Sequence, residues 1–281
     1  MFQPDLLAGK RILITGGGTG LGKSMGRRFL ELGAGLAICG RRAEVLEATA
    51  REHEKATGGV VTAHACDVRD ANAVEAMVER LLEDGPLHAL VNNAAGNFVA
   101  RSEELSPRAI DAVVGIVLRG SVSCTLACGR RWLADGQPGT VLSIVTTYAW
   151  TGSAYVLPSA MAKAGVLAMT RSLAVEWGGR GIRLNAIAPG PFPTQGAWER
   201  LVPRPDLARR FETRNPLGRV GEHRELADLA AFLLADGSAF VNGEVVTIDG
   251  GEWLKGAGQF NFLGDMLSEE DWQALKPKRS G

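Results

Sequence analysis

The chain has 281 residues, enough for the core of a single α/β domain. Its 31 basic and 31 acidic residues give a formal net charge of zero, whereas a nucleic-acid-binding protein usually needs a concentrated basic field. No basic start with a long apolar run opens the chain, and no stretch reaches the ~20 uninterrupted apolar residues of a membrane span, so we expect a cytoplasmic protein without nucleic-acid partners or membrane spans.

Short apolar runs alternate along the chain with segments of helical period. The apolar runs predict strands at Arg11–Thr15, Leu36–Cys39, Val60–Ala65, Ala89–Val91, Thr140–Val145, Arg183–Ala188 and Glu244–Ile248. The helical periods predict helices at Gly20–Leu32, Ala43–Ala56, Ala71–Leu82, Pro107–Leu133, Ser159–Trp177 and Arg224–Leu234. Strands that are apolar on both faces and separated by helices indicate a parallel sheet covered on both sides. With right-handed crossovers, residues 1–281 are expected to form one doubly wound, Rossmann-type domain of about seven strands.

Glycines follow the first predicted strand with the spacing G-x-x-x-G-x-G, at Gly16, Gly20 and Gly22. Glycine permits positive φ and lets backbone N–H groups approach a pyrophosphate, and the N-terminus of the following helix adds partial positive charge. Glycines alone also fit a tight turn. Because the strand before and the helix after are both present, we predict a dinucleotide-binding site.

Residues after the second and third strands indicate which dinucleotide binds. Where an NAD site usually offers an acidic residue, this chain has Gly40 followed by Arg41 and Arg42, which could grip a 2′-phosphate, so we predict NADPH. The alternative is a solvated arginine pair that opens a helix. Asp67 could accept a hydrogen bond from the adenine amino group or cap the next helix, and Arg69 follows at the same end of the sheet.

Cysteine and histidine spacing favours no metal site. Cys39, Cys66, Cys124 and Cys128 form no C-x-x-C pair and lie in apolar or helical patterns, so we expect buried free thiols. The four histidines are scattered without ligand spacing, and we predict no metal.

Four motifs in order resemble the short-chain dehydrogenase/reductase family across nearly the whole chain. They are the glycine loop "TGGGTGLG", "NNAAG" (Asn92–Gly96) after the fourth strand, "RLNAIAPGPFPT" (Arg183–Thr194) at the sixth, and "IDGG" (Ile248–Gly251) at the last. The resemblance implies further cofactor contacts from the glycine loop and from the ends of the fourth and sixth strands. These are Thr19, Leu21, Asn93, Ala94, Gly96, Pro189, Gly190 and Phe192.

The usual catalytic residues of that family are largely replaced. Its Tyr-x-x-x-Lys pair keeps Lys163, but Ser159 stands at the tyrosine position and Thr146 at the upstream serine position. Val117, three residues before Gly120, stands where the family usually has asparagine. A plain alcohol or ketone reductase is therefore not expected.

One subgroup shares this departure. "NNAAGNF", "TTYAWTGS", "VLPSAMAKAGV", "LAVEWG" and "PGPFPTQGA" resemble the 2,4-dienoyl-CoA reductases, most nearly the mitochondrial type. The resemblance implies that Tyr148 is the acid, Asn97 its partner, Lys163 the cofactor lysine and Ser159 an auxiliary polar contact to the substrate. Tyr155 would be packing or pocket wall. The resemblance also places Arg69, Phe98 and Arg200 near the substrate.

Each of these roles has a structural alternative. Ser159 after Pro158 could merely cap a helix, Asn97 could form a turn, and Lys163 could lie on a solvated helix face. Arg200 could be an exposed, solvated arginine.

The function implied by the resemblance is NADPH-dependent reduction of 2,4-dienoyl-CoA to 3-enoyl-CoA in β-oxidation of unsaturated fatty acids. Hydride would go to C5, and Tyr148 and Asn97 would hold the oxyanion. Residues 189–215 would form a substrate lid, 252–281 a C-terminal extension, and the enzyme a homotetramer. Two alternatives stay open, namely a reductase of another enoyl or keto thioester and a non-catalytic NADP-binding protein.

Overall fold

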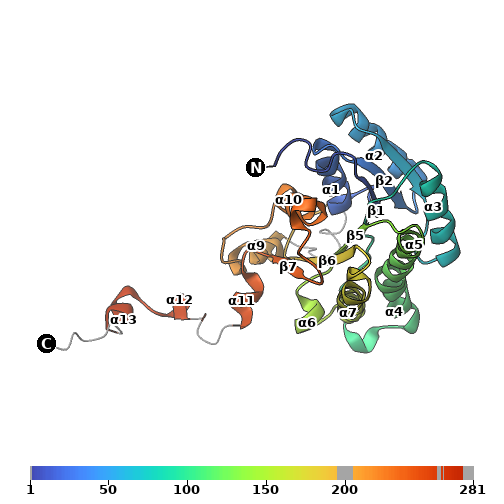
Figure 1. The fold of residues 1–281 in the computed structure, drawn as a ribbon. Coiled ribbons are helices and arrows are strands. Elements are labelled where there is room, and N and C mark those ends of the chain that lie inside the picture. Colours follow the sequence, from blue (N-terminus) through green and yellow to red (C-terminus); the bar gives the residue numbers. More distant parts are fainter. Residues whose placement is uncertain (1, 195–204, 258–260, 262, 275–281) are drawn as a thin grey trace.

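A computed structural model of the protein describes residues 2–194, 205–257, 261 and 263–274. Seven parallel strands form one sheet in the order β3-β2-β1-β4-β5-β6-β7 (Figure 1). The strands are β1 (Arg11–Thr15), β2 (Gly35–Gly40), β3 (Val61–Ala65), β4 (Ala89–Asn92), β5 (Gly139–Ile144), β6 (Ile182–Pro189) and β7 (Val245–Ile248). This confirms the predicted single Rossmann-type domain.

Helices cover both faces of the sheet (Figure 1). One face carries α1 (Gly20–Glu31), α2 (Ala43–Thr57) and α10 (His223–Leu234). The other carries α3 (Ala71–Glu83), α4 (Pro107–Val114), α5 (Gly120–Ala134) and α7 (Leu157–Gly178). The remaining α-helices of the described chain are α6 (Tyr148–Thr151), α9 (Pro205–Arg214), α11 (Glu252–Ala257), α12 (Leu263–Met266) and α13 (Glu269–Ala274).

The two cores follow from the alternation of side chains along each buried strand. In β1, Ile12 and Ile14 enter the core beneath α1 and α10, whereas Leu13 enters the core beneath α3 and α5. All three side chains are fully buried. Burial of such a side chain on either face stabilises the fold by roughly 1.5–3 kcal/mol, which explains why these strands are apolar throughout.

The helix predicted over Pro107–Leu133 is interrupted. Residues Gly115–Arg119 form one turn of π-helix between α4 and α5. Gly120 lies where a Cβ would come within 2.6 Å of the Val68 side chain, so the chain crosses the end of β3 closely there. Such π-turns are frequent at functional sites, and Val117, buried in this turn, occupies the position where the family usually has asparagine.

The segment Pro107–Ala134 is also the one described helix that is long and apolar enough, by length and composition, to cross a membrane. Within the described chain, 56% of its most apolar window is buried in the domain. Its buried residues belong to two cores, one shared with α3 and α7 and one shared with α7 and β6, which is the pattern of a core helix.

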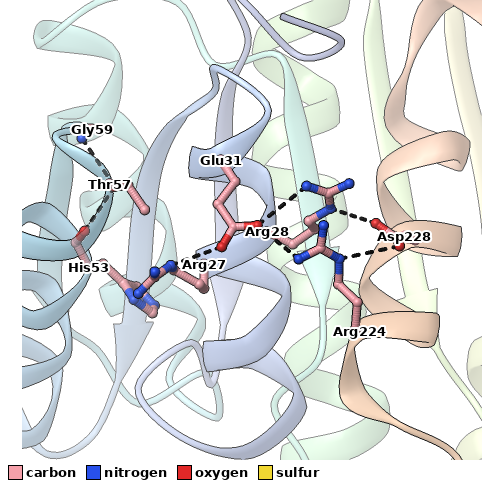
Figure 2. Close-up of polar contacts among 8 residues, drawn as sticks. All are labelled: Arg27, Arg28, Glu31, His53, Thr57, Gly59, Arg224 and Asp228. Carbon is pink, nitrogen blue, oxygen red and sulfur yellow. Dashed lines mark hydrogen bonds and ion pairs between the residues drawn. The ribbon is translucent and has the colours of Figure 1, made fainter. Parts of the chain in front are cut away.

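An ion-pair network joins α1 to α10 on the outer face of the domain (Figure 2). Glu31 of α1 accepts hydrogen bonds from Arg27 and Arg28 of the same helix and from Arg224 of α10. Arg224 Nη1 lies 3.1 Å from Glu31 Oε2. Asp228 of α10 accepts from Arg28 and Arg224. Arg28 is only 12% exposed, so this network is shielded more than isolated surface pairs are.

Candidate active site

The glycine loop after β1 has the backbone that its sequence predicts. Gly16 and Gly20 have φ of +67° and +55°, a region that other residues rarely adopt. A Cβ at Gly22 would come within 2.5 Å of both the Gly16 carbonyl oxygen and Asn93 Nδ2. The first turn of α1 is therefore packed directly against the loop, with its backbone N–H groups at the carboxyl end of the sheet.

Thr15 and Asn93 connect this loop to the end of β4. The backbone N–H groups of Asn93 and Ala94 donate to Thr15 Oγ1, at 3.0 and 2.9 Å. The Asn93 side chain donates to the carbonyls of Thr15 and Gly16. Asn93 thus shapes the glycine loop with its side chain. The sequence analysis did not single out Thr15. The feature that could have identified it is a hydroxyl-bearing residue at the end of an otherwise apolar strand segment.

The residues around this loop fit a nicotinamide dinucleotide. Thr19, at the N-cap of α1, makes no side-chain cap hydrogen bond, so it does not occupy the N–H groups of the first turn. Arg41 and Arg42 are exposed just after β2, and neither pairs with a carboxylate in the described part of the chain. One site for a pyrophosphate and one for a further phosphate are therefore available at this end of the sheet.

The segment after β6 closes toward the glycine loop. A Cβ at Gly20 would lie 3.3 Å from Thr194 Cγ2, and one at Gly190 would lie 2.7 Å from Asp249 Cβ. Phe192 is buried against Gly221. Thr194 thus contacts the predicted cofactor loop, whereas Pro189, Gly190 and Phe192 pack against β7, Asp249 and Gly221.

Four predicted catalytic residues come from three segments that follow β4 and β5. Tyr148 lies on α6, and its hydroxyl is 3.1 Å from Ser159 Oγ in the first turns of α7. Asn97, after β4, donates through Nδ2 to the Tyr148 hydroxyl at 3.4 Å. Asn97 Oδ1 also accepts the backbone N–H of Phe98, and neither residue lies in an assigned turn, so the contact with Tyr148 is the one that the structure supports.

Two of the alternatives for α7 are wrong. The N-cap of α7 is Val156, and Ser159, which is 2% exposed, contacts Tyr148 and does not cap the helix. Lys163 is buried on the next turn of α7, not solvated, and its Nζ donates to the carbonyl of Ile144 at the end of β5. Burial lowers the pKa of Lys163 to about 8.

Tyr155 does not pack in the core. Its side chain is 59% exposed, and its φ of +67° is the one positive value of a non-glycine residue among those the structure describes. Its carbonyl accepts the N–H of Ala100 at 3.0 Å, which joins the segment after β4 to the segment between α6 and α7. This backbone hydrogen bond helps to stabilise the positive φ of Tyr155.

Asp67 and Arg69 are paired with each other. Arg69 Nη2 lies 2.5 Å from Asp67 Oδ2, and this hydrogen bond lowers the pKa of Asp67. The cap of α3 is Asp70, which accepts the N–H groups of Asn72 and Ala73, so the capping alternative for Asp67 is wrong. Arg69 lies along Gly115 of the π-turn, and it reaches the cofactor end of the sheet without an anion to bind other than Asp67 among the described residues.

The remaining predicted residues differ in how far the structure describes them. Phe98 is half-buried against the small core formed by α4, α7 and β6. Gly96 lies near Ile116 of the π-turn, and Leu21 is half-buried in the first turn of α1. Arg200 lies outside the described residues, as do 195–204 of the predicted lid; the described parts of that lid are 189–194 and 205–215, the second of which contains α9.

The titratable groups of the described residues form no group of three or more that could hold a metal ion. The four cysteines are free and buried, and burial raises the pKa of each thiol. These thiols are therefore poor nucleophiles and poor metal ligands at neutral pH.

Comparison with known proteins identifies relatives over nearly the full length. The family model described as "Enoyl-(Acyl carrier protein) reductase" matches residues 16–252. A protein of Caenorhabditis elegans named "Probable 2,4-dienoyl-CoA reductase 3 [(3E)-enoyl-CoA-producing]" is 42% identical over 96% of this chain and 88% of its own length. One of Bacillus subtilis named "Probable 2,4-dienoyl-CoA reductase [(2E)-enoyl-CoA-producing]" is 45% identical over 87% of this chain and 97% of its own.

Solved structures agree. A short chain dehydrogenase from Bacillus anthracis superposes with a TM-score of 0.80 at 42% identity, covering 87% of this chain and 96% of that chain. A gluconate 5-dehydrogenase from Burkholderia cenocepacia, in complex with NADP and tartrate, superposes with a TM-score of 0.84 at 30% identity, covering 89% and 98%. Together with the glycine loop and the seven-stranded sheet, these relatives place the chain in the short-chain dehydrogenase/reductase family of oxidoreductases.

Proposed function

We propose that the protein reduces 2,4-dienoyl-CoA to 3-enoyl-CoA with NADPH. The observation that carries the proposal is the hydrogen-bonded cluster of Tyr148, Asn97 and Ser159. In this cluster the tyrosine is residue 148, and a serine stands at position 159, where the family usually has its tyrosine. The names of the relatives from Caenorhabditis elegans and Bacillus subtilis support the substrate class.

The chemistry explains why the phenol is displaced. In a ketone reductase, the acid must stand beside the carbon that receives hydride, because that carbon bears the oxygen. In a conjugated dienoyl thioester, NADPH would supply hydride at C5, and negative charge would appear at the thioester oxygen, at the other end of the conjugated system. The acid belongs beside that oxygen, away from position 159.

Tyr148 and Asn97 can hold this oxygen together. The Asn97 carboxamide has two N–H donors, of which one reaches the phenol oxygen and the other remains for a substrate. The phenol accepts from Asn97, and with Ser159 as the donor of their shared hydrogen bond the phenol O–H is left to donate to the thioester oxygen. Preorganised donors of this kind act where charge develops, and losing one typically costs about 3 kcal/mol of transition-state stabilisation.

Ser159 and Lys163 would complete the site. Ser159, in the first turns of α7, would hold the phenol in place, because its Oγ lies 3.1 Å from the Tyr148 hydroxyl oxygen. Lys163 on the next turn would hold the nicotinamide ribose through its ammonium group while its contact with Ile144 keeps it in place. A proton must finally reach Cα, supplied by Tyr148 or by a water that the phenol orders.

We propose NADPH as the cofactor because of Arg41 and Arg42. Both are exposed at the end of β2, and neither forms an ion pair within 4.0 Å in the described part of the chain, so they could bind a 2′-phosphate in a bidentate manner. Arg69 would exchange its bond with Asp67 for a phosphate of the cofactor or substrate.

A second candidate is reduction of a 2-enoyl thioester. The description of the matching family model favours it, since it names an enoyl thioester reductase. The same oxyanion contacts would serve, with hydride received closer to the oxygen.

The test measures NADPH oxidation by purified protein with 2,4-hexadienoyl-CoA, crotonyl-CoA and acetoacetyl-CoA side by side, with NMR of the product. We expect the dienoyl substrate to be preferred. Tyr148→Phe and Asn97→Ala should each lower kcat by about 100-fold, as for other oxyanion donors, with NADPH affinity retained. Wild-type turnover in both variants would exclude the mechanism, and a preference for crotonyl-CoA would favour the second candidate.

We further propose that the protein is a homotetramer, as the family resemblance implies, and that it is cytoplasmic, as the sequence pattern indicates. Light scattering on the eluted protein measures the assembly directly, and a monomer at micromolar concentration would contradict it.

A further inference from the structure

Two tryptophans join the C-terminal segment to the short helix that carries Tyr148. Trp150 on α6 and Trp253 on α11 meet edge to face, with ring centroids 5.9 Å apart and ring planes at 83°. This is the geometry that aromatic pairs favour, because the positive edge of one ring meets the negative face of the other. Neither residue belongs to the glycine loop or to the polar cluster described above.

The helix α6 needs support from outside itself. It spans only Tyr148–Thr151, and a single helical turn is unstable without tertiary contacts. The segment after it is exposed, beginning with Gly152 at φ +71°. Asn97 and Ser159 contact the phenol end of Tyr148, so the contact of Trp150 with Trp253 holds a different part of the same turn.

Hydrogen bonds hold Trp253 and the start of α11 in place. Asp249, buried just after β7, accepts the N–H groups of Gly251 and Trp253, both at 2.9 Å. Asn215 donates to the carbonyl of Asp249 at 2.7 Å, and Gly190 packs closely against Asp249 from the segment after β6. The start of α11 is thus fixed to the region predicted to hold the nicotinamide.

We propose that Trp253 is a positioning residue for Tyr148, acting through Trp150. The inference rests on the proposed function, since it concerns the acid of that reaction. The ring contact fixes α6 relative to α11 and keeps the phenol between Asn97 and Ser159. Without it, α6 retains its sequence and its polar partners but samples orientations in which the phenol leaves the thioester oxygen.

The experiment compares Trp253→Ala, Trp253→Phe and Trp150→Ala with Leu254→Ala, a control at the next position of α11 whose side chain is 60% exposed. The readout is the single-turnover rate of NADPH oxidation with 2,4-hexadienoyl-CoA. We expect Trp253→Ala and Trp150→Ala to lower this rate by about two- to tenfold, the range set by the energy of an aromatic pair. The double variant should be no slower than either single one, because both remove the same contact.

Three further readouts separate positioning from general loss of structure. The KM for NADPH should stay at its wild-type value, and the melting temperature should fall by no more than about 4 °C, the shift expected from losing one aromatic pair. Trp253→Phe should restore most of the rate, and the exciton signal of the tryptophan pair in far-ultraviolet circular dichroism should vanish in both alanine variants. Leu254→Ala should match the wild type in every measurement.

A wild-type rate in Trp253→Ala, a rate loss that Trp253→Phe does not restore, or a fall in melting temperature of more than about 10 °C would overturn the proposal while the proposed function stands. If the wild-type chain oxidises no NADPH with the dienoyl substrate, the proposed function fails and the positioning role falls with it. The exciton signal distinguishes these cases, because it reports the ring contact without any turnover.

Discussion

Lys163 illustrates how burial can set the working pH of a single residue. Its Nζ lies among apolar groups with one carbonyl partner, and desolvation lowers its pKa to about 8. The ammonium form, which would hold the nicotinamide ribose, is therefore complete below that pH and is lost as the pH rises through it.

We accordingly expect kcat/KM for NADPH to fall about tenfold per pH unit above a pKa near 8, because this ratio reports ionisation in the free enzyme. Initial rates across the alkaline range measure it. Lys163→Met should show a low kcat/KM with no such alkaline limb. A wild-type profile that stays flat to about pH 10 would show that the buried lysine does not titrate in this range.

At the scale of a residue, the sequence named candidate site residues but not the contacts between them. The resemblance named Tyr148, Asn97, Ser159 and Lys163, and the structure brings the first three together. Those contacts join segments after two different strands, so no local spacing could supply the distances. The pairing of Asp67 with Arg69 was not predicted either, because the sequence pattern does not give the directions of side chains after a strand.

At the scale of an element, the α1–α10 network allows a stability prediction. Glu31 pairs with three guanidinium groups, and its side chain is 29% exposed. Glu31→Gln should therefore lower the free energy of unfolding by about 1 kcal/mol. Urea titrations measure this, and the difference should shrink at about 1 M salt, where the Debye length is short.

The control for that prediction is Glu47→Gln on α2. Glu47 is 60% exposed, and its pair with Arg51 spans 3.8 Å, so the expected change lies within about 0.5 kcal/mol. Equal effects of both substitutions would mean that shielding by the neighbouring helices does not strengthen the network.

Element bounds were predictable because period and capping are local. Strand β1 was predicted to the residue, and α7 begins two residues earlier than expected, at Leu157 before Pro158, where proline favours the first turn. The π-turn at Gly115–Arg119 escaped prediction, since one extra residue in an apolar helix leaves the hydrophobic pattern almost intact. The ring contact of Trp150 with Trp253 escaped it too, because the two residues lie far apart in sequence.

At the scale of the whole molecule, fold class followed from the alternation of strands and helices alone, whereas acid sensitivity requires the packed structure. Burial lowers the pKa of His53, His64 and His88 below the ordinary value of 6.5. In His53 the cause is plain, because its ring is 1% exposed between α1 and α2 and neither nitrogen has a hydrogen-bond partner among the described residues.

These shifts set the direction of the pH dependence. The folded state favours neutral rings, so the unfolded chain binds more protons as the pH falls through 6.5 toward the lowered folded pKa values. The free energy of unfolding should therefore decrease over that window, by at most about 1.4 kcal/mol per pH unit for each proton taken up. Urea titrations of wild type and His53→Leu at about pH 7.5 and 5.5 measure the slope, which should be smaller in the variant. Identical slopes would mean that the His53 ring keeps its ordinary pKa in the folded protein, and that the contact between α1 and α2 opens readily enough to hydrate it.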